Sequence, residues 1–142
     1  MSTGVLVDTS VWSLALRRKS HHLSAEEKAM AGELSELITA GRARLIGVVR
    51  LELLSGIRSP EQYEKLRKTL RAYEDEPVDV EDYEAAAEAT NACRAKGVTG
   101  STVDFLICAM AMRRQWPVLS SDPDFRRYSK VLPLKLWATM RE

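Results

Sequence analysis

The sequence predicts an α/β fold, a three-layer α/β/α sandwich around a mainly parallel sheet of about five strands. Short apolar segments alternate with longer helical patterns along the whole chain, which is the order found in strand–helix–strand units. The first segment, Gly4–Val7, is aliphatic without polar alternation, as expected for a strand covered on both faces. Residues 1–142 contain no repeat, low-complexity segment or linker, so we expect a single domain.

The N-terminal half is expected to contain two strands and four helices. Two of the helices lie between the strands in sequence, and two follow the second strand. After the first strand, a helix is expected at Trp12–Arg18. Ser24 should begin the next helix, because its hydroxyl can cap backbone N–H groups and Glu27 completes a capping box, and Gly41 should end it. The remaining elements of this half are a strand at 44–48, a short helix at 50–55 and a charged helix at 60–74 that begins with a proline.

The C-terminal half is expected to continue the alternation. Ser101–Arg114 is the most apolar helical segment, so we expect it to be buried against the sheet. Before it come a short strand at 77–80 and an alanine-rich helix at 81–96. After it come a strand at 117–119 whose first residue is a proline, a short turn or helix at 122–128 and an edge strand at 131–136.

Composition excludes several classes of protein. With 45% hydrophobic and 29% charged residues, the chain is neither disordered nor fibrous. Its net charge of +1 means that any nucleic-acid surface must be local. Cys93 and Cys108 lack metal-binding or redox spacing and are expected to be buried in a reducing compartment. We expect a soluble, cytoplasmic protein without contact with a membrane, because the chain begins without a signal-peptide pattern and no apolar run approaches the roughly 20 residues of a membrane span.

Four acidic residues stand where apolar stretches break: Asp8, Glu52, Asp104 and Asp122. Because the carboxyl ends of parallel strands meet at one edge of a sheet, Asp8 and Asp122 should be neighbours there. Glu52 and Asp104, in the first part of two helices, can face the same edge. Asp104 directly precedes an apolar run, where an ionised carboxylate is unfavourable unless a cation meets it. The four acids therefore predict a shared metal site.

Clustered carboxylates repel one another, and a hard divalent cation relieves that repulsion. Oxygen ligands without histidine or cysteine favour Mg²⁺, with Mn²⁺ as the alternative, over zinc. Such a site suits phosphodiester hydrolysis. The hydroxyls of Thr9, Ser10, Ser120 and Ser121 could orient ligands, water or phosphate. We expect contacts with substrate phosphates at three basic residues near the entrance of the site, Arg17, Arg18 and Lys19.

Four segments carry a resemblance to a known family: Val7-Asp8-Thr9-Ser10-Val11, Leu51-Glu52-Leu53-Leu54-Ser55-Gly56, Val103-Asp104-Phe105-Leu106-Ile107-Cys108-Ala109 and Leu119-Ser120-Ser121-Asp122-Pro123-Asp124-Phe125. In this order they resemble the PIN-domain ribonucleases. The small single-domain form is similar to the VapC-type toxin of VapBC toxin–antitoxin pairs.

The resemblance implies a PIN-like fold and metal-dependent endonucleolytic cleavage of RNA. It implies that Asp8, Glu52 and Asp104 are the core acids, that Asp122 is the fourth and that Ser10 occupies the family's hydroxyl position. It also implies a homodimer and a VapB-like antitoxin, which exposed apolar positions on the helices from Ser24 and Pro60 would bind. Asp124 competes with Asp122 for the fourth place, and we expect Asp124 to cap the following turn instead.

The candidate site residues also have simpler structural interpretations. Asp8 or Asp104 could only cap a helix, and Glu52 could pair with Arg50 or Arg58. The basic residues Lys65, Arg67, Lys68 and Arg71 are more typical of a solvated helix face than of an RNA contact.

Other functions compete with the nuclease. A phosphohydrolase could use Asp8 as a nucleophile, but Ser10 stands where such enzymes carry a second acid. A receiver-like signalling domain would need an acid pair after the first strand and a phosphoacceptor after the third, and neither is present, although Lys135 faintly resembles its lysine. A catalytically silent PIN-like scaffold that binds a partner is the third alternative.

Overall fold

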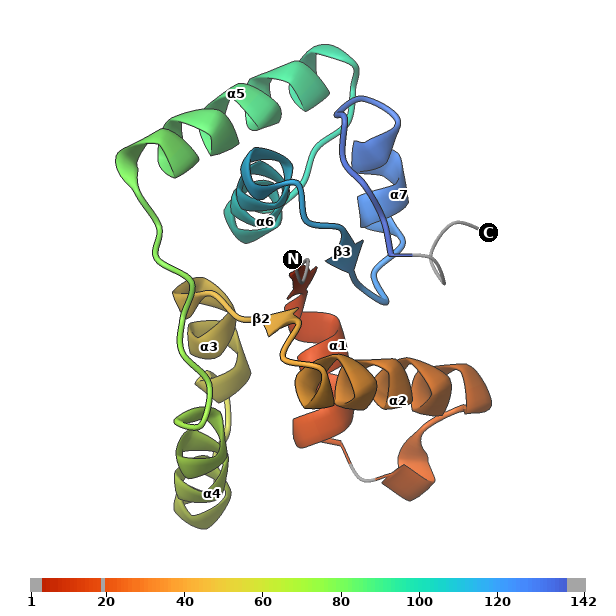
Figure 1. Ribbon diagram of the computed structural model, residues 1–142, viewed down its shortest axis with the longest axis vertical. Coiled ribbons are helices and arrows are strands. Elements are labelled where there is room, and N and C mark those ends of the chain that lie inside the picture. The colour runs from red at the N-terminus through yellow and green to blue at the C-terminus, as the bar shows by residue number, and fades with distance from the viewer. Residues whose placement is uncertain (1–3, 19, 138–142) are drawn as a thin grey trace.

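The computed structural model describes residues 4–18 and 20–137. Three short strands, eight-residue to sixteen-residue helices and two shorter helical segments alternate along them (Figure 1). In chain order the elements are β1 (Val5–Val7), α1 (Thr9–Leu16), a 3₁₀ turn (Ser20–His22), α2 (Ala25–Thr39), β2 (Ala43–Arg44), α3 (Gly47–Leu54), α4 (Pro60–Leu70), α5 (Val80–Ala95), α6 (Thr102–Arg114), β3 (Val118–Leu119) and α7 (Asp124–Ser129).

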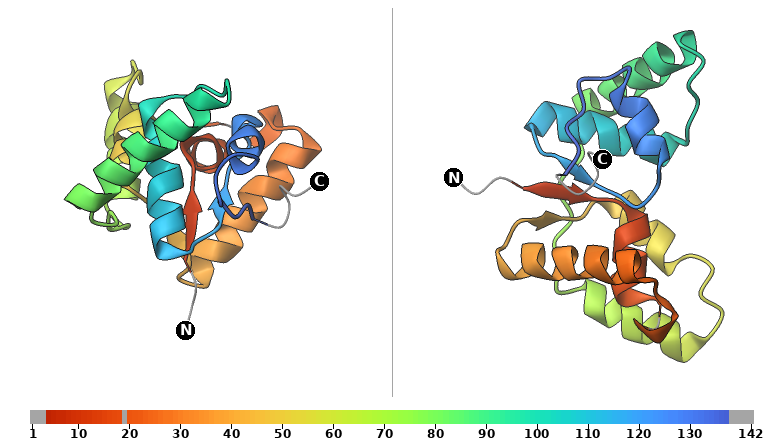
Figure 2. Two further views of the ribbon diagram at one scale, coloured as in Figure 1. Left: turned by 90° about the horizontal axis from the view of Figure 1, so that it is seen from above. Right: turned by 90° about the vertical axis from the view of Figure 1, so that its right-hand side faces the viewer.

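The sheet is parallel and has the order β2–β1–β3, with the first strand of the chain in the middle. Helices α1 to α4 lie on one side of it and α5, α6 and α7 on the other (Figures 1 and 2). All three residues of β1 are fully buried, as expected for a strand covered on both faces. The predicted three-layer α/β/α class is therefore confirmed.

The sheet has fewer strands than predicted. Beyond β1, β2 and β3, the described residues form only two isolated parallel bridges, Leu45 with Asp75 and Val118 with Leu136. The predicted strand at 77–80 is wrong, because Asp79 caps α5 through a capping box and the helix begins at Val80. The predicted edge strand at 131–136 makes only the bridge at Leu136.

Other boundaries moved by a few residues. The strand predicted at 44–48 is only Ala43–Arg44, because α3 already begins at Gly47. The helix predicted at 60–74 ends at Leu70. The Ser24 and Glu27 capping box is confirmed, with both reciprocal hydrogen bonds formed.

The α5–α6 pair is joined by a buried ion cluster. Asp82 is fully buried in α5 and accepts hydrogen bonds from Arg113 (2.6 Å) and, through both oxygens, from Arg114 (2.8 and 2.9 Å) in α6. These charge-assisted contacts hold the pKa of Asp82 well below its usual range, with the Arg114 hydrogen bonds as the main cause. The cluster fixes α5 against α6, the helix that carries Asp104.

Two sequence predictions about the interior and the membrane can be compared with the structure. Cys93 and Cys108 are both buried and unpaired, as predicted. Across residues 4–18 and 20–137, none of the helices combines the length and the apolar character that crossing a bilayer requires.

Candidate metal centre

Asp8 lies between the end of β1 and the start of α1. Its side chain caps α1, as the simpler interpretation predicts, and the residue is 5% exposed. One carboxylate oxygen, Oδ2, accepts hydrogen bonds from the Ser10 hydroxyl (2.8 Å) and from the buried Ser120 hydroxyl (2.7 Å). Two hydroxyls from different strand ends therefore hold this carboxylate in one orientation.

Ser120 connects Asp8 to the acids that follow β3. Its hydroxyl oxygen accepts a hydrogen bond from the backbone N–H of Asp122 (2.9 Å). Oδ1 of Asp122 in turn accepts from the N–H of Asp124 (2.9 Å). The prediction that Asp124 caps this turn is wrong: Asp124 is the first residue of α7, which has no side-chain cap, and its carboxylate pairs with Arg127.

Asp104 lies in the first turn of α6, where Ser101 caps the helix and accepts from the Asp104 N–H (3.0 Å). The Tyr128 hydroxyl donates to Oδ2 of Asp104 at 2.6 Å. The ring of Tyr128 packs against Phe105 and Phe125, with centroids 5.0 and 5.2 Å away. A tyrosine of α7 thus holds an acid of α6.

Sequence reasoning missed Tyr128 and the glycine that makes room for it. A Cβ on Gly100 would collide with the Tyr128 hydroxyl. Gly100 lies in the loop between α5 and α6, and nothing in the local pattern around Tyr128 distinguishes it from an ordinary core aromatic. The contact becomes visible only when α6 and α7 lie side by side.

Three carboxylates converge beside these contacts. One oxygen from each of Asp104, Asp122 and Asp124 lies within 4.8 Å of the other two, and all three residues are partly buried. Burial raises the pKa of Asp104; the Tyr128 hydrogen bond opposes this shift, and the charges of Asp8 and Asp122 add to it. The donor set consists of carboxylate oxygens, which fits a hard divalent cation such as Mg²⁺ or Mn²⁺.

The structure places Asp122 and Asp124 together at Asp104, where the sequence offered them as alternatives. Asp8 is joined to this group through Ser120, although it is not one of the three acids within 4.8 Å. Glu52 is not one of these three acids either. It is exposed on α3 and accepts from the Thr9 hydroxyl at 2.5 Å, so Glu52 is hydrogen-bonded to the residue next to Asp8.

The pairing of Glu52 with Arg50 or Arg58 is not found among the described residues. Arg50 instead bonds to Asp75 and to the carbonyl oxygens of Leu70 and Tyr73. Among the described residues, the hydrogen-bond partner of the Glu52 carboxylate is therefore Thr9 and neither arginine.

The three basic residues predicted to contact RNA have different surroundings. Arg18 is paired with Glu27 at 2.8 Å, so part of its charge is already neutralised. Arg17 is exposed at the end of α1 and lines a cavity. Lys19 lies outside the described residues.

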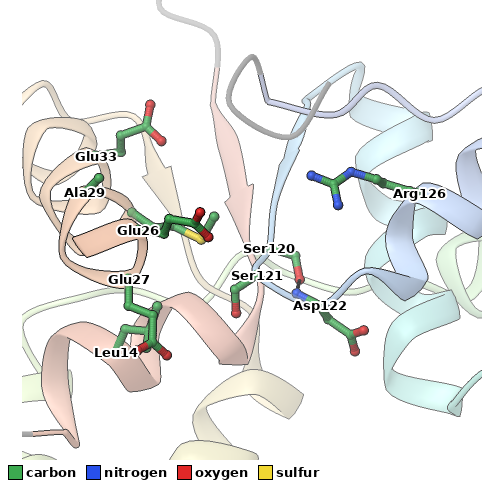
Figure 3. A pocket seen from close by; sticks show the side chains of 10 residues that line it. Leu14, Glu26, Glu27, Ala29, Glu33, Ser120, Ser121, Asp122 and Arg126 are labelled. Carbon is green, nitrogen blue, oxygen red and sulfur yellow. Dashed lines mark hydrogen bonds between the residues drawn. The ribbon is translucent and has the colours of Figure 1, made fainter. Parts of the chain in front are cut away.

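A cavity of about 550 Å³ opens beside the acids, between α2 and α7. Figure 3 shows Ser120, Ser121 and Asp122 at its centre, with the Asp122 carboxylate pointing away from α2. Glutamates of α2 form the opposite wall, Glu26, Glu27 and Glu33. Arg126 of α7 is the one cation among its described lining residues. This side of the site is predominantly acidic.

Comparison with solved structures shows the same fold in three proteins. FitAcB from Neisseria gonorrhoeae superposes with a TM-score of 0.74 at 18% identity, over 97% of this chain and 99% of that one. VapBC2 from Rickettsia felis, bound to a DNA fragment from its promoter, gives 0.70 at 16% identity over 94% and 96%. VapBC-5 from Mycobacterium tuberculosis, a member of the VapBC family of toxin–antitoxin systems, gives 0.65 at 17% identity over 94% and 97%.

A search of curated protein sequences found no significant match. The model of the PIN domain family matches residues 5–131, a range that includes every acid described above. The chain therefore belongs to the PIN domain family.

Proposed function

We propose that this protein is a Mg²⁺- or Mn²⁺-dependent endoribonuclease that acts as the toxin of a type II toxin–antitoxin pair. The observation that carries the proposal is the convergence of Asp104, Asp122 and Asp124 within 4.8 Å, beside the oriented carboxylate of Asp8. Membership of the PIN family, whose domains are generally nucleases, supports hydrolysis of a phosphodiester bond.

Asp104, Asp122 and Asp124 are the residues that would hold the cation, with Asp8 completing the site through the Ser120 contact. A bound divalent cation supplies a lowered pKa for an attacking water and neutralises charge that builds on the phosphate. The protein's own contribution is preorganisation: Ser10 and Ser120 fix Asp8, and Tyr128 fixes Asp104. Acids held in this way need little rearrangement when the substrate arrives.

Glu52 has a different role in this proposal. It is exposed, accepts a hydrogen bond from the Thr9 hydroxyl and is not one of the three clustered acids. We propose that it accepts a proton from water or ligates the cation together with Asp8. Its substitution by glutamine tests this role separately from the cluster.

The toxin assignment rests on the fold shared with the VapBC proteins, one of which is described as a toxin–antitoxin system. A groove of about 420 Å³ between α1 and α2 has an apolar lining that includes Leu16, Leu23, Leu34 and Ile38. Such a groove suits an apolar helix face of an antitoxin. On α4, by contrast, Leu66 and Leu70 are buried and Tyr63 remains 38% exposed, so α4 offers less apolar surface than predicted. The homodimer remains a prediction, which a mass measurement in solution with and without the co-expressed antitoxin would test.

The experiment is RNA cleavage with Mg²⁺ or Mn²⁺ by the purified chain and by single variants of the site: Asp8→Asn, Glu52→Gln, Asp104→Asn, Asp122→Asn and Asp124→Asn. We expect the wild type to cut at defined positions, seen as new RNA 5′ ends, and the variants of the cluster and of Asp8 to lose cleavage while keeping their circular dichroism spectrum. Glu84→Gln, an exposed acid of α5, is the matched control and should cut normally. Cleavage that survives in both Asp8→Asn and Asp104→Asn would refute the assignment.

A further inference from the structure

A second cavity, of about 490 Å³, lies where the end of α1, the segment after α3 and helix α4 meet. Three cations line it, Arg17 from α1, Arg58 from the α3–α4 segment and Lys65 from α4. The amide of Gln62 adds a polar group, and the largely buried side chain of Leu66 lies beneath them.

The lining of this cavity contains no carboxylate. Within residues 4–18 and 20–137, none of its three cations forms a salt bridge, whereas the neighbouring cations Arg18 and Arg67 are paired with glutamates. Like charges gathered around one cavity repel each other, and an anion relieves that repulsion. In a chain of net charge +1, this concentration of unpaired positive charge is local.

The two cavities therefore have opposite character. The cavity at Ser120 and Asp122 presents the glutamates of α2, which repel a polyanion. The cavity at Arg17, Arg58 and Lys65 attracts one. A nucleic-acid strand that reaches the acids is therefore expected to run past the basic cavity and to avoid the acidic one.

The basic cavity is also tied to the acids by the helices that build both. Asp8 begins α1 and Arg17 caps its other end, nine residues further on, or about 14 Å at 1.5 Å per residue. Helix α3 carries Glu52 and leads directly into the segment that contains Arg58. The spacing between the acids and the cations is therefore set by short, rigid helices.

We propose that this cavity, lined by Arg17, Arg58 and Lys65, binds a backbone phosphate of the RNA strand whose scissile phosphate lies at the acids. Guanidinium groups bind phosphate oxygens in pairs, and lysine adds a point charge. The proposal rests on the proposed ribonuclease function and adds to it the direction in which the strand leaves the site. It also gives Lys65, expected from sequence to be only a solvated surface charge, a partner.

The test is the affinity of a fluorescein-labelled single-stranded oligouridylate, measured by anisotropy in EDTA so that cleavage does not occur. Wild type is compared with the triple variant Arg17→Gln/Arg58→Gln/Lys65→Gln. The control triple variant Arg94→Gln/Lys96→Gln/Lys135→Gln removes the same charge from exposed positions elsewhere. Each protein is measured over a series of salt concentrations, because the slope of log affinity against log salt counts phosphate contacts.

We expect the cavity variant to bind roughly tenfold more weakly and to lose about 0.7 from the magnitude of the salt slope, because the cavity is proposed to bind one backbone phosphate and each phosphate contact to a single strand contributes about 0.7. The control variant should keep the wild-type slope. Circular dichroism of the three proteins should agree, because all the substituted side chains are exposed.

Equal slopes and affinities in the wild type and the cavity variant would overturn the proposal, even if the wild type cuts RNA. If the cavity variant keeps its RNA affinity but no longer forms a complex with the co-expressed antitoxin, the cavity serves an acidic protein segment and the RNA proposal is again overturned. A wild type that binds this RNA but cuts none with Mg²⁺ or Mn²⁺ contradicts the proposed nuclease function. Even then, a smaller salt slope in the cavity variant than in the wild type and the control variant would support the phosphate site.

Discussion

Replacing Asp104 by asparagine should stabilise the protein in the absence of metal and remove its stabilisation by metal. In wild type, Asp104 is partly buried and its carboxylate shares a 4.8 Å group with Asp122 and Asp124. Burial and the neighbouring charges of Asp8 and Asp122 both oppose its ionised form. Asparagine has nearly the same shape, and its Oδ1 can still accept the hydrogen bond from Tyr128. The variant therefore removes mainly a repulsive charge.

The size of the effect follows from the spacing. The three carboxylate oxygens lie within 4.8 Å of one another, and two unit charges at that separation repel by about 3.5 kcal/mol at an effective dielectric constant of 20. Exposed pairs contribute only about 0.2–1 kcal/mol because water screens them. The three acids are intermediate in burial, so we expect Asp104→Asn to raise the free energy of unfolding by about 1–2 kcal/mol. For a chain of this size this corresponds to roughly 4 °C in Tm.

The assay is thermal unfolding in EDTA and in Mn²⁺. At about 100 times its dissociation constant, a bound ion stabilises the folded wild type by about 2.7 kcal/mol. The order of stability should therefore invert: Asp104→Asn is the more stable protein in EDTA, and the wild type is the more stable one in Mn²⁺. Glu84→Gln should follow the wild type in both conditions. A variant that is less stable in EDTA, or that gains as much from Mn²⁺ as the wild type, would refute the reasoning.

Three further predictions concern the contacts that support the site. Asp82→Asn should lower the free energy of unfolding by about 3 kcal/mol at pH 7, because it leaves two guanidinium groups without their buried carboxylate, whereas Glu84→Gln should change it by less than about 0.5 kcal/mol in the same urea titration. Since the folded-state pKa of Asp82 is lowered, its contribution is complete above the unfolded-state pKa of about 3.9 and is lost as the pH falls below it; a difference between wild type and variant that does not shrink on acidification would contradict this. Tyr128→Phe should lower the free energy of unfolding by about 1.5 kcal/mol, because it removes the 2.6 Å hydrogen bond to Asp104 and keeps the ring packing. Equal urea midpoints for the variant and the wild type would show that this hydrogen bond contributes nothing to stability. Gly100→Ala should lower the free energy of unfolding by about 1–3 kcal/mol, because the added methyl group displaces the Tyr128 hydroxyl. The double variant with Tyr128→Phe should lose less stability than the sum of the two single variants, a non-additivity that a double-mutant cycle measures.

Much of the fold was readable from local patterns. The aliphatic run at Val5–Val7, the capping box of α2 and the apolar character of α6 each depend on residues close in sequence, and each predicted element exists. The wrongly predicted strands are those at the edges of the sheet. The segment at 77–80 has strand-like composition, but Asp79 and Asp82 form a capping box that begins a helix there, and the segment at 131–136 contributes one bridge because strand pairing depends on neighbours distant in the chain.

The sequence by itself determined the family and offered the candidate acids, because four short motifs can be read from residue types and their order whatever the details of packing. Only the tertiary structure decided how those acids are grouped. It placed Asp124 with Asp104 and Asp122, joined Glu52 to Thr9, and brought in Tyr128, which no motif marks. It also gathered Arg17, Arg58 and Lys65 around one cavity. The physical reason is that spacing along the chain fixes which side chains share a helix face, whereas contacts between α1, α4, α6 and α7 arise only when the helices pack together around the sheet.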